Sequence, residues 1–501
     1  MNGALARFLC TVLVAALGAV ACAGAEGPAP SDWTLPNGGR GSERALPNSP
    51  ITAANVKGLH LVWAYRFTHS AVHDPNHSPE TIRGVIATPI VAGTTVYVQD
   101  STSSVYAIDR STGTLRWEHR FNAPNFGRNG LAYSSGSLYG ATDTTAFALS
   151  AKTGRLIWQR RLVTPVQQYV DIAPLIANNL VYVSTVGYPP GGRGALYALD
   201  AHSGDVRWSF STIAGRWRHP AAAGGGGAWY TPSIDAKGDV YWGIANPYPL
   251  GGTRALPNGA AYAGAALYTD SLVELDGQTG RLLWHDQVVS HDVRDYDFQL
   301  PPILLPAGAG GPALVVGGGK AGFVVAWNAA THKRVWQTSV GRHLNDRGPL
   351  PEHEVTVCPG FLGGVETPMA SAGSTVFVPV VDLCARGSAF GFEPIAKLDP
   401  VDGTGELVAL NAASGKLSWR RTFPQPDFGC ATATAGVVFT STFNGRVYGL
   451  DAGTGATLWQ AQAPAGINGC PTLSGNMLLV PAGSGSTRLR YPKYELVAYG
   501  L

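Results

Sequence analysis

The stretch Val105–Asp109, followed by Thr112-Gly113 and then by Trp117, is a unit that the chain repeats. In each copy an apolar run ends at Asp or Asn, a short turn segment follows, and a tryptophan closes the unit. Alternating apolar residues are typical of strands with one buried face, and Asp or Asn followed by Gly is typical of hairpin turns. Six further tryptophans close copies of this unit: Trp158, Trp208, Trp284, Trp336, Trp419 and Trp459.

Two half-units lie near the ends of the chain. Trp63, within Leu59–Phe67, lacks the upstream half, and Glu495–Tyr499 is an upstream half without a tryptophan. Together they would complete an eighth unit, and their pairing would remove exposed sheet edges. The sequence therefore predicts an all-β fold, an eight-bladed β-propeller with tryptophan-docking repeats, closed by pairing of the N- and C-terminal strands.

Composition excludes some classes of partner and points to two long insertions. The chain has 501 residues, of which 14% are charged, and a formal net charge of +3. No Lys/Arg run is typical of a nucleic-acid or membrane-surface patch, so we expect neither partner. The intervals from Trp208 to Trp284 and from Trp336 to Trp419 are long, and extra loops on a rigid scaffold often carry sites.

The N-terminus is typical of an export signal. Arg7 precedes the apolar run Phe8–Val20, which is too short to span a bilayer. We expect residues 1–22 to be a signal peptide, with two alternatives at its end: ordinary cleavage, or a lipoprotein-type signal with a lipid anchor on Cys22. Residues 23–45 are then a flexible leader and residues 46–501 a single propeller domain. This predicts an exported protein, in the periplasm or at the cell envelope or surface.

Four cysteines follow the signal segment. An exported chain meets an oxidising compartment, so we expect the pairs Cys358–Cys384 and Cys430–Cys470. Four buried thiols are the alternative. No spacing matches a zinc pattern, and no Cys-x-x-Cys-His haem-attachment sequence occurs.

Several segments outside the repeat resemble one family. They are Asn125–Gly130, Gly224–Tyr230, Val240–Pro247, His291–Asp297 and Gly317–Gly322. With the repeats, they resemble the pyrroloquinoline quinone (PQQ) dehydrogenases, which include methanol, ethanol, polyvinyl alcohol and membrane glucose dehydrogenases. The resemblance covers nearly the whole mature chain. Tryptophan-ended repeats alone are also found in non-catalytic scaffolds of outer-membrane assembly.

The resemblance implies three cofactor-binding residues. Arg128 matches an arginine that holds polar edges of PQQ, and a guanidinium offers a planar donor fork to carboxylates. Trp229, which lies outside the repeat tryptophans, matches the residue on which the flat cofactor stacks. Lys320 matches a cation at the quinone carbonyls, where it would stabilise negative charge.

A metal site and a catalytic base are implied in the same way. Asn246 and Asp295 match metal ligands, and Asp295 also matches the catalytic base that takes the proton of the alcohol. Asp297, two residues further on, is a third candidate ligand. Calcium prefers such oxygen ligands, and two carboxylates would also suit a lanthanide ion.

The chain departs from the family pattern in two places. The family has a metal-ligand Glu where Pro189 stands here, and the segment around it contains no acid. The adjacent-cysteine disulfide of alcohol dehydrogenases is absent, since Ala123-Pro124-Asn125 occupies that region.

These features predict a PQQ-dependent dehydrogenase that oxidises a small alcohol or sugar and passes electrons to a separate cytochrome c or other acceptor. A non-catalytic propeller, acting as an envelope scaffold or binding lipoprotein, is the alternative. A different ligand in the same funnel, such as a glycan, is a third reading.

Overall fold

The structure is a computed structural model. It describes residues 32–68, 72–73, 81–82, 84–125, 127–163, 168–187, 191–214, 224–248, 251–259, 264–308, 311–394, 397–486, 488–489, 491 and 493–501. Strands dominate, and the short 3₁₀ helices are η1 (Val56–Gly58), η2 (Pro257–Gly259) and η4 (Pro400–Asp402). Across these ranges, no helix has the length and apolar character needed to cross a membrane.

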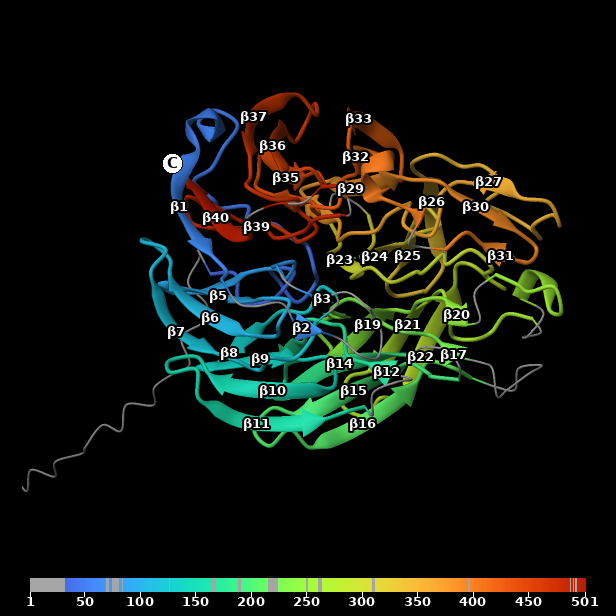
Figure 1. The fold of residues 1–501 in the computed structure, drawn as a ribbon, viewed down its shortest axis with the longest axis horizontal. Helices are drawn as coiled ribbons and strands as arrows, with labels where there is room; N and C mark the ends of the chain where they lie inside the picture. The colour runs from blue at the N-terminus through green and yellow to red at the C-terminus, as the bar shows by residue number, and fades with distance from the viewer. Residues whose placement is uncertain are drawn as a thin grey trace, which may run out of the picture.

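The larger sheets are antiparallel and follow one another around a common centre in chain order (Figure 1). The first sheet contains β4 (Ile90–Ala92), β5 (Thr95–Gln99), β6 (Val105–Asp109) and β7 (Leu115–His119), and the second contains β8 (Ala132–Ser134), β9 (Ser137–Ala141), β10 (Thr145–Ser150) and β11 (Leu156–Arg161). The third contains β12 (Gln168–Tyr169), β13 (Leu175–Ala177), β14 (Leu180–Gly187), β15 (Ala195–Asp200) and β16 (Val206–Ser211). The fourth contains β18 (Ser233–Ile234), β19 (Asp239–Gly243), β21 (Ser271–Asp276) and β22 (Leu282–Gln287).

The fifth sheet contains β23 (Ile303–Leu305), β24 (Leu314–Gly318), β25 (Phe323–Asn328) and β26 (Arg334–Ser339), and the sixth contains β28 (Ala370–Ala372), β29 (Thr375–Asp382), β32 (Thr404–Asn411) and β33 (Leu417–Phe423). The seventh contains β34 (Thr432–Ala433), β35 (Val437–Ser441), β36 (Arg446–Asp451) and β37 (Thr457–Gln462). The eighth contains β38 (Thr472–Ser474), β39 (Met477–Ala482), β40 (Glu495–Gly500) and β1 (His60–Arg66). Smaller sheets pair β2 (Val72–His73) with β3 (Thr81–Ile82), β17 (Gly224–Gly225) with β20 (Pro247–Tyr248), and β27 (Val355–Val357) with β30 (Ala385–Ser388) and β31 (Gly391–Phe392). The arrangement is the β-propeller that the repeats predict.

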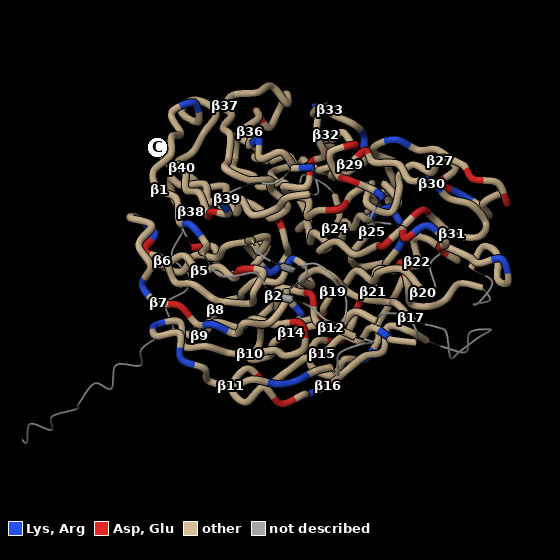
Figure 2. Tube along the Cα trace, viewed as in Figure 1, with Lys and Arg blue, Asp and Glu red and all other residues tan. Residues whose placement is uncertain are grey.

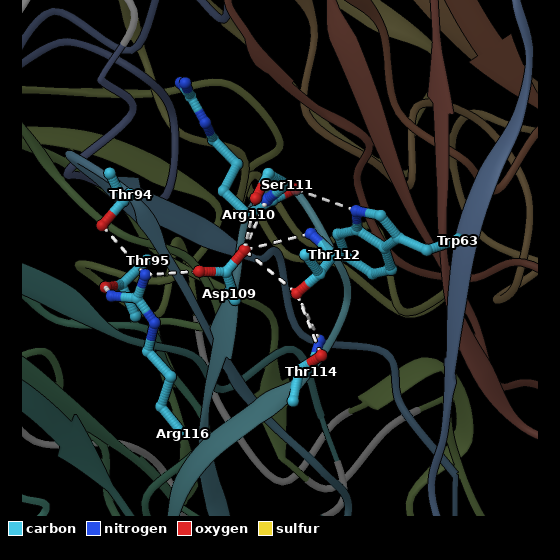
Figure 3. Close-up of polar contacts among 9 residues, drawn as sticks. All are labelled: Trp63, Thr94, Thr95, Asp109, Arg110, Ser111, Thr112, Thr114 and Arg116. Carbon is cyan, nitrogen blue, oxygen red and sulfur yellow. Dashed lines mark hydrogen bonds and ion pairs between the residues drawn. The ribbon is translucent and has the colours of Figure 1, made fainter.

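The repeated tryptophan docks on the turn of the next unit. Trp63 Nε1 donates to the Arg110 carbonyl at 2.8 Å, and Asp109 holds that turn by accepting from the backbone N–H groups of Ser111 and Thr112 (Figure 3). Gly113 has a φ of 72°, and a Cβ there would lie 2.8 Å from the Trp63 ring. The same indole donation recurs from one unit to the next: Trp117 to Ala151, Trp158 to Ala201, Trp208 to Gly277, Trp336 to Ala412, and Trp419 to Ala452.

One copy of the docking contact differs. In the unit after Trp284, His332 stands where the other turns have glycine, and it keeps a positive φ of 59°. Its ring stacks on Trp284 with centroids 4.9 Å apart, and its Nε2 lies 2.7 Å from Glu274 Oε2. A stacked aromatic ring thus takes the place of a close glycine contact.

The two predicted half-units share one sheet. Strand β1 pairs antiparallel with β40, from His60 opposite Gly500 to Arg66 opposite Glu495. Trp459 Nε1 donates to the Leu59 carbonyl at 2.9 Å, so the last unit docks on the first segment of the domain.

Both predicted disulfides are confirmed, Cys358–Cys384 and Cys430–Cys470. The first joins the insertion that carries β27 to the loop before β30, and the second joins the loops that precede β34 and β38.

Residues 32–46, which we call the strap, are packed against the sheets, although the sequence predicted a flexible leader up to residue 45. Trp33 is 1% exposed and Arg44 is fully buried. The strap pairs with the free edges of central strands, because an innermost strand has unpaired backbone groups on its axial side. Backbone N–H groups from six of the larger sheets donate to strap carbonyls: Val91 to Trp33, Tyr133 to Thr34, Ile234 to Arg40, Leu304 to Gly41, Ser371 to Glu43, and Ala433 to Arg44. The rest of the predicted leader, residues 23–31, and the signal segment with Cys22 lie outside the described residues.

Candidate functional site

One position of the repeat supplies most of the site. The first strand of a larger sheet lies nearest the centre, and the tryptophan-bearing strand lies at the rim (Figure 1). A residue four positions before a first strand therefore reaches the same end of the central channel in each unit. At this position stand Arg128, Asp171, Trp229, Gln299, Glu366 and Asn468. Charged residues of both signs accordingly occur near the centre as well as on the rim (Figure 2).

Arg128 ties three of these units together. Its Nη1 donates to the Glu366 carbonyl at 2.7 Å, and its Nη2 donates to Asn468 Oδ1. The guanidinium also lies over the Tyr230 ring, 5.2 Å from the centroid. Burial lowers the pKa of Arg128 to about 10, although Glu366 and Asp171 oppose this. The residue stays charged at neutral pH and carries positive charge into the channel.

Two buried acids lie beside Arg128. Burial raises the pKa of Asp171 to about 7, with Arg128 opposing the rise, and burial also raises the pKa of Glu366. Asp171 lies against Gly127, where an added Cβ would fall 1.6 Å from its Oδ1, so only glycine fits there. The carboxyl of Glu366 accepts from Gln299 Nε2 at 3.3 Å.

Trp229 presents an indole whose N–H is buried and finds no acceptor within the described ranges. The ring meets Tyr169 edge-on with centroids 5.9 Å apart and packs beside Tyr230. The Tyr230 hydroxyl donates to the Glu366 carbonyl at 2.7 Å, which links Trp229 to the Arg128 contacts.

Lys320 bridges the two candidate acids of the 291–297 segment. Its Nζ lies 2.8 Å from Asp295 Oδ2 and 2.6 Å from Asp297 Oδ2. The second contact is an ion pair whose angles do not meet those of a hydrogen bond. Burial would lower the pKa of Lys320, but the attraction of Asp295 and Asp297 outweighs it and raises that pKa well above its ordinary value. Burial raises the pKa of Asp295 to about 8, against the opposing effect of Lys320.

Asn246 joins this cluster through its backbone. Its N–H donates to Asp297 Oδ1 at 2.8 Å, and its side-chain Nδ2 donates to the Pro247 carbonyl at 2.8 Å. Asp270 is fully buried nearby, and its backbone N–H donates to the Ala245 carbonyl. Burial, together with Asp292, Asp297 and Asp295, raises the pKa of Asp270 well above its ordinary value.

The structure thus brings together four of the six residues proposed from the sequence, Asn246, Asp295, Asp297 and Lys320. Arg128 and Trp229 reach the same end of the channel through Glu366, whose charge also acts on Lys320. Pro189 lies outside the described residues, so its position relative to this cluster is not part of the geometry.

A metal ion of the calcium type fits the chemistry of the donors, because two carboxylates and an amide are oxygen ligands. Within the described residues, however, no group of three or more His, Cys, Asp or Glu side chains is arranged to hold a metal. The Lys320 ammonium already neutralises part of the charge of Asp295 and Asp297.

A flat, polyanionic ligand fits the other half of the site. In the part of the chain that the structure describes, buried polar atoms without hydrogen-bond partners gather here, namely Trp229 Nε1, Asn129 Nδ2 and Oδ1, Thr367 Oγ1 and Glu366 Oε1. Buried polar groups are nearly always paired, so such atoms indicate a missing partner. The donors among them, with Arg128 and Lys320, suit the carboxylates and carbonyls of PQQ.

A separate cavity of about 470 Å³ lies behind the 288–296 segment. Its lining includes Asp292, Arg294 and Tyr296 but none of the six proposed site residues. It is therefore distinct from the candidate site.

Four residues of the site were missed from the sequence: Asp171, Asp270, Gln299 and Asn468. Superposing the repeats on their first strands, rather than on their tryptophans, would have found Asp171, Gln299 and Asn468, because all three occupy the Arg128 position. No sequence signal marks Asp270, whose proximity depends on the way two insertions fold together.

Family models match two parts of the chain. Residues 33–341 match the model described as "Glucose/ethanol/alcohol dehydrogenase, beta-propeller domain". Residues 403–491 match the model of the outer membrane protein assembly factor BamB.

Curated relatives are quinoprotein and quinohemoprotein enzymes. A quinohemoprotein alcohol dehydrogenase of Comamonas testosteroni is 28% identical over 487 residues, which cover 82% of this chain and 66% of that protein. A quinoprotein alcohol dehydrogenase of Pseudomonas putida is 26% identical, covering 84% of this chain and 80% of the relative. The chain thus spans just under two thirds of the Comamonas protein.

Solved structures agree on the fold. A quinohemoprotein alcohol dehydrogenase from Pseudomonas putida superposes with a TM-score of 0.81 at 22% identity, covering 94% of this chain and 80% of the other. A europium-containing methanol dehydrogenase gives a TM-score of 0.79 at 21% identity, covering 94% and 98%.

Proposed function

This chain belongs to the family of the β-propeller domain of glucose, ethanol and alcohol dehydrogenases, and we propose on that premise that it is a PQQ-dependent dehydrogenase that oxidises an alcohol. The observation that carries the proposal is the buried contact of Lys320 with Asp295, at the channel end where Arg128 and the unpaired Trp229 N–H also lie. An acid and a cation in one buried site are what transfer of a proton and a hydride requires.

Asp295 is the proposed catalytic base. It would take the hydroxyl proton as the carbon-bound hydrogen leaves as hydride, so that the alcohol becomes a carbonyl compound. When bound, PQQ supplies the quinone that accepts the hydride. Lys320 would stabilise the negative charge that develops, Arg128 would hold carboxylates, and Trp229 would give the cofactor a flat apolar surface.

We propose Ca²⁺ or a lanthanide at Asn246, Asp295 and Asp297. Lys320 would then have to release one carboxylate, because its ammonium now contacts both. A bound metal would supply Lewis-acid polarisation of the quinone carbonyl. Asp297 would compensate for the acid that Pro189 does not provide.

The partners and the location are part of the same proposal. The names of the relatives favour an alcohol as substrate, and a sugar is the alternative. The chain contains no haem-attachment motif, so electrons would leave to a separate cytochrome c or another acceptor. The two disulfides support export to the periplasm or cell surface, where thiols oxidise, with lipidation of Cys22 as a variant of that proposal.

We propose that the larger sheets make one closed ring of eight blades over residues 46–501. The pairing of β1 with β40 supports closure, and the docking of Trp459 on Leu59 supports contact between the last and first units.

Reconstitution tests the function. The purified protein is incubated with PQQ and Ca²⁺ or La³⁺, and dye reduction is measured with a panel of alcohols and sugars. We expect bound PQQ by absorbance and alcohol-dependent dye reduction, which Asp295→Ala lowers by about 10²–10⁴-fold while the far-ultraviolet circular dichroism stays unchanged. Absence of PQQ binding with either metal would contradict the proposal.

A non-catalytic scaffold is the second candidate. The match of residues 403–491 to BamB favours it, as does the lack of acid around Pro189. In that case the protein would bind neither PQQ nor metal, and an envelope protein would co-purify with it through the channel face.

A further inference from the structure

The backbone turns sharply at Asp295. Its φ is 67°, in the left-handed region, which residues other than glycine rarely adopt. Such a conformation persists only where neighbouring groups hold it, and it is often found at functional sites.

Asp292 binds the backbone N–H groups of the residues on both sides of Asp295. Its Oδ1 accepts from the Arg294 backbone N–H at 2.8 Å, and its Oδ2 accepts from the Tyr296 backbone N–H at 2.7 Å. Asp292 is 2% exposed, and both hydrogen bonds are buried. One buried side chain thus brackets the residue proposed as the base.

The two bracketing residues are themselves anchored away from the site. Arg294 Nε donates to the Asn345 carbonyl at 2.9 Å, and its Nη2 donates to the Gly348 carbonyl at 2.7 Å. The Tyr296 hydroxyl donates to the Pro359 carbonyl at 3.0 Å, beside Cys358 of the first disulfide. The Asp292 carboxyl therefore joins two fixed points, and Asp295 is the residue between them that remains free to face Lys320.

We propose that Asp292 is a positioning residue for the reaction: its carboxyl fixes the left-handed turn at Asp295 and so places the Asp295 carboxyl at Lys320. The inference rests on the proposed function in that it takes Asp295 as the base. The negative charge of Asp292 also raises the pKa of Asp295, after the larger effects of burial, Lys320 and Asp297.

The structural half of the test needs no cofactor. Amide hydrogen exchange with single-residue resolution is measured on the full chain, and crystal structures are determined for wild type and Asp292→Asn. We expect slow exchange at Arg294 and Tyr296 in wild type, and faster exchange at one or both in the variant, since an amide side chain has only one acceptor oxygen. The variant should also lengthen the Asp295–Lys320 contact.

Asp200→Asn is the matched control. Asp200 also accepts from two backbone N–H groups, those of His202 and Ser203 at 2.9 and 3.0 Å, but with one oxygen and in a repeat turn at the rim. It should leave exchange at Arg294 and Tyr296, and all kinetics, as in wild type. Fast exchange at both amides in wild type itself overturns the proposal, even where no Asp292 variant folds.

The kinetic half separates positioning from mere stability. A displaced base costs about 100-fold in rate, so we expect kcat of Asp292→Asn to fall by about that factor, with KM and PQQ affinity little changed. In an Asp295→Ala background the same substitution should add no further loss, because residues that act through one another are not additive. Equal losses in both backgrounds overturn the proposal. Lack of PQQ-dependent activity in wild type would instead contradict the proposed function, while the exchange and crystal measurements would still decide the role of Asp292.

Discussion

At the scale of single residues, burial shifts the pKa values of the channel's acids more than the neighbouring cations do. Asp171 shows this directly, because its pKa rises to about 7 even though Arg128 opposes the rise. A carboxyl that is protonated in the fold and ionised in the unfolded chain makes stability depend on pH.

For Asp171 the sign follows from its two pKa values, 3.8 as the ordinary value and about 7 in the fold. Below pH 3.8 both states carry the proton and the contribution to stability is fully present. As the pH rises towards 7 the unfolded chain releases its proton first, so stability is lost, by at most about 4 kcal/mol. Asp171→Asn should remove this pH dependence. The free energy of unfolding of the variant, relative to that of wild type, should therefore be higher at pH 8 than at pH 4. Thermal midpoints at several pH values measure it, with Asp205→Asn, an exposed carboxyl, as the control.

The residue roles were predictable from the sequence only where a motif stood behind them. Asp295, Asp297 and Lys320 lie in short segments whose pattern is specific, and the structure brings them together. Asp171 could have been placed by its spacing from the first strand of its sheet, but not its contact with Gly127. Asp292 could not be assigned at all, because its role comes from two backbone amides, which neither residue type nor spacing marks.

At the scale of elements, the repeat was predictable because its turn chemistry is local. The exception is His332, whose position in the docking turn depends on stacking with Trp284 and on contact with Glu274, which a tryptophan-based alignment does not reveal. The strap was also missed, because a segment that bonds to six different sheets has no periodicity of its own.

The docking turn gives a prediction with a control in the same sheet. Gly154 and Gly136 both have positive φ, 70° and 81°. A Cβ on Gly154 would lie 2.5 Å from the Trp117 ring, whereas a Cβ on Gly136 would meet nothing within 4 Å. Gly136→Ala should therefore cost about 1 kcal/mol for the backbone alone, and Gly154→Ala a further 1–3 kcal/mol for overpacking, roughly. Thermal unfolding of the two variants compares them, and equal midpoints would show that the indole does not need the glycine.

At the scale of the whole molecule, the strap decides which end of the channel is open. Arg128 and Trp229 lie four residues before the first strands of their sheets, whereas the strap bonds to residues within first strands, such as Tyr133 and Leu304. The strap therefore lies below the site along the channel. Under the proposed function, ligands would reach the site from the face that carries the insertions, and the same face would have to receive an electron acceptor.

Arg44 is the residue on which the strap depends most. Its guanidinium is fully buried and donates to the carbonyls of Ala431, Pro36 and Pro471 at 2.9, 3.0 and 2.6 Å. Burial lowers its pKa to about 9, so the residue keeps its charge at neutral pH. The charged guanidinium therefore bonds to neutral carbonyl acceptors. Arg44→Met should leave these carbonyls unpaired and cost about 3 kcal/mol or more.

The matched control for that variant is Arg207→Met, since Arg207 is 60% exposed and its substitution should change stability by less than about 0.5 kcal/mol. Amide exchange distinguishes a strap from a loose leader, because the N–H groups of Tyr133, Ile234, Leu304, Ser371 and Ala433 all donate to it. They should exchange slowly in wild type and faster together in Arg44→Met, whereas amides inside the outer strands keep their rates. If the five amides already exchange as fast as free strand edges in wild type, the channel is open at both ends, and access to the site would no longer be restricted to one face.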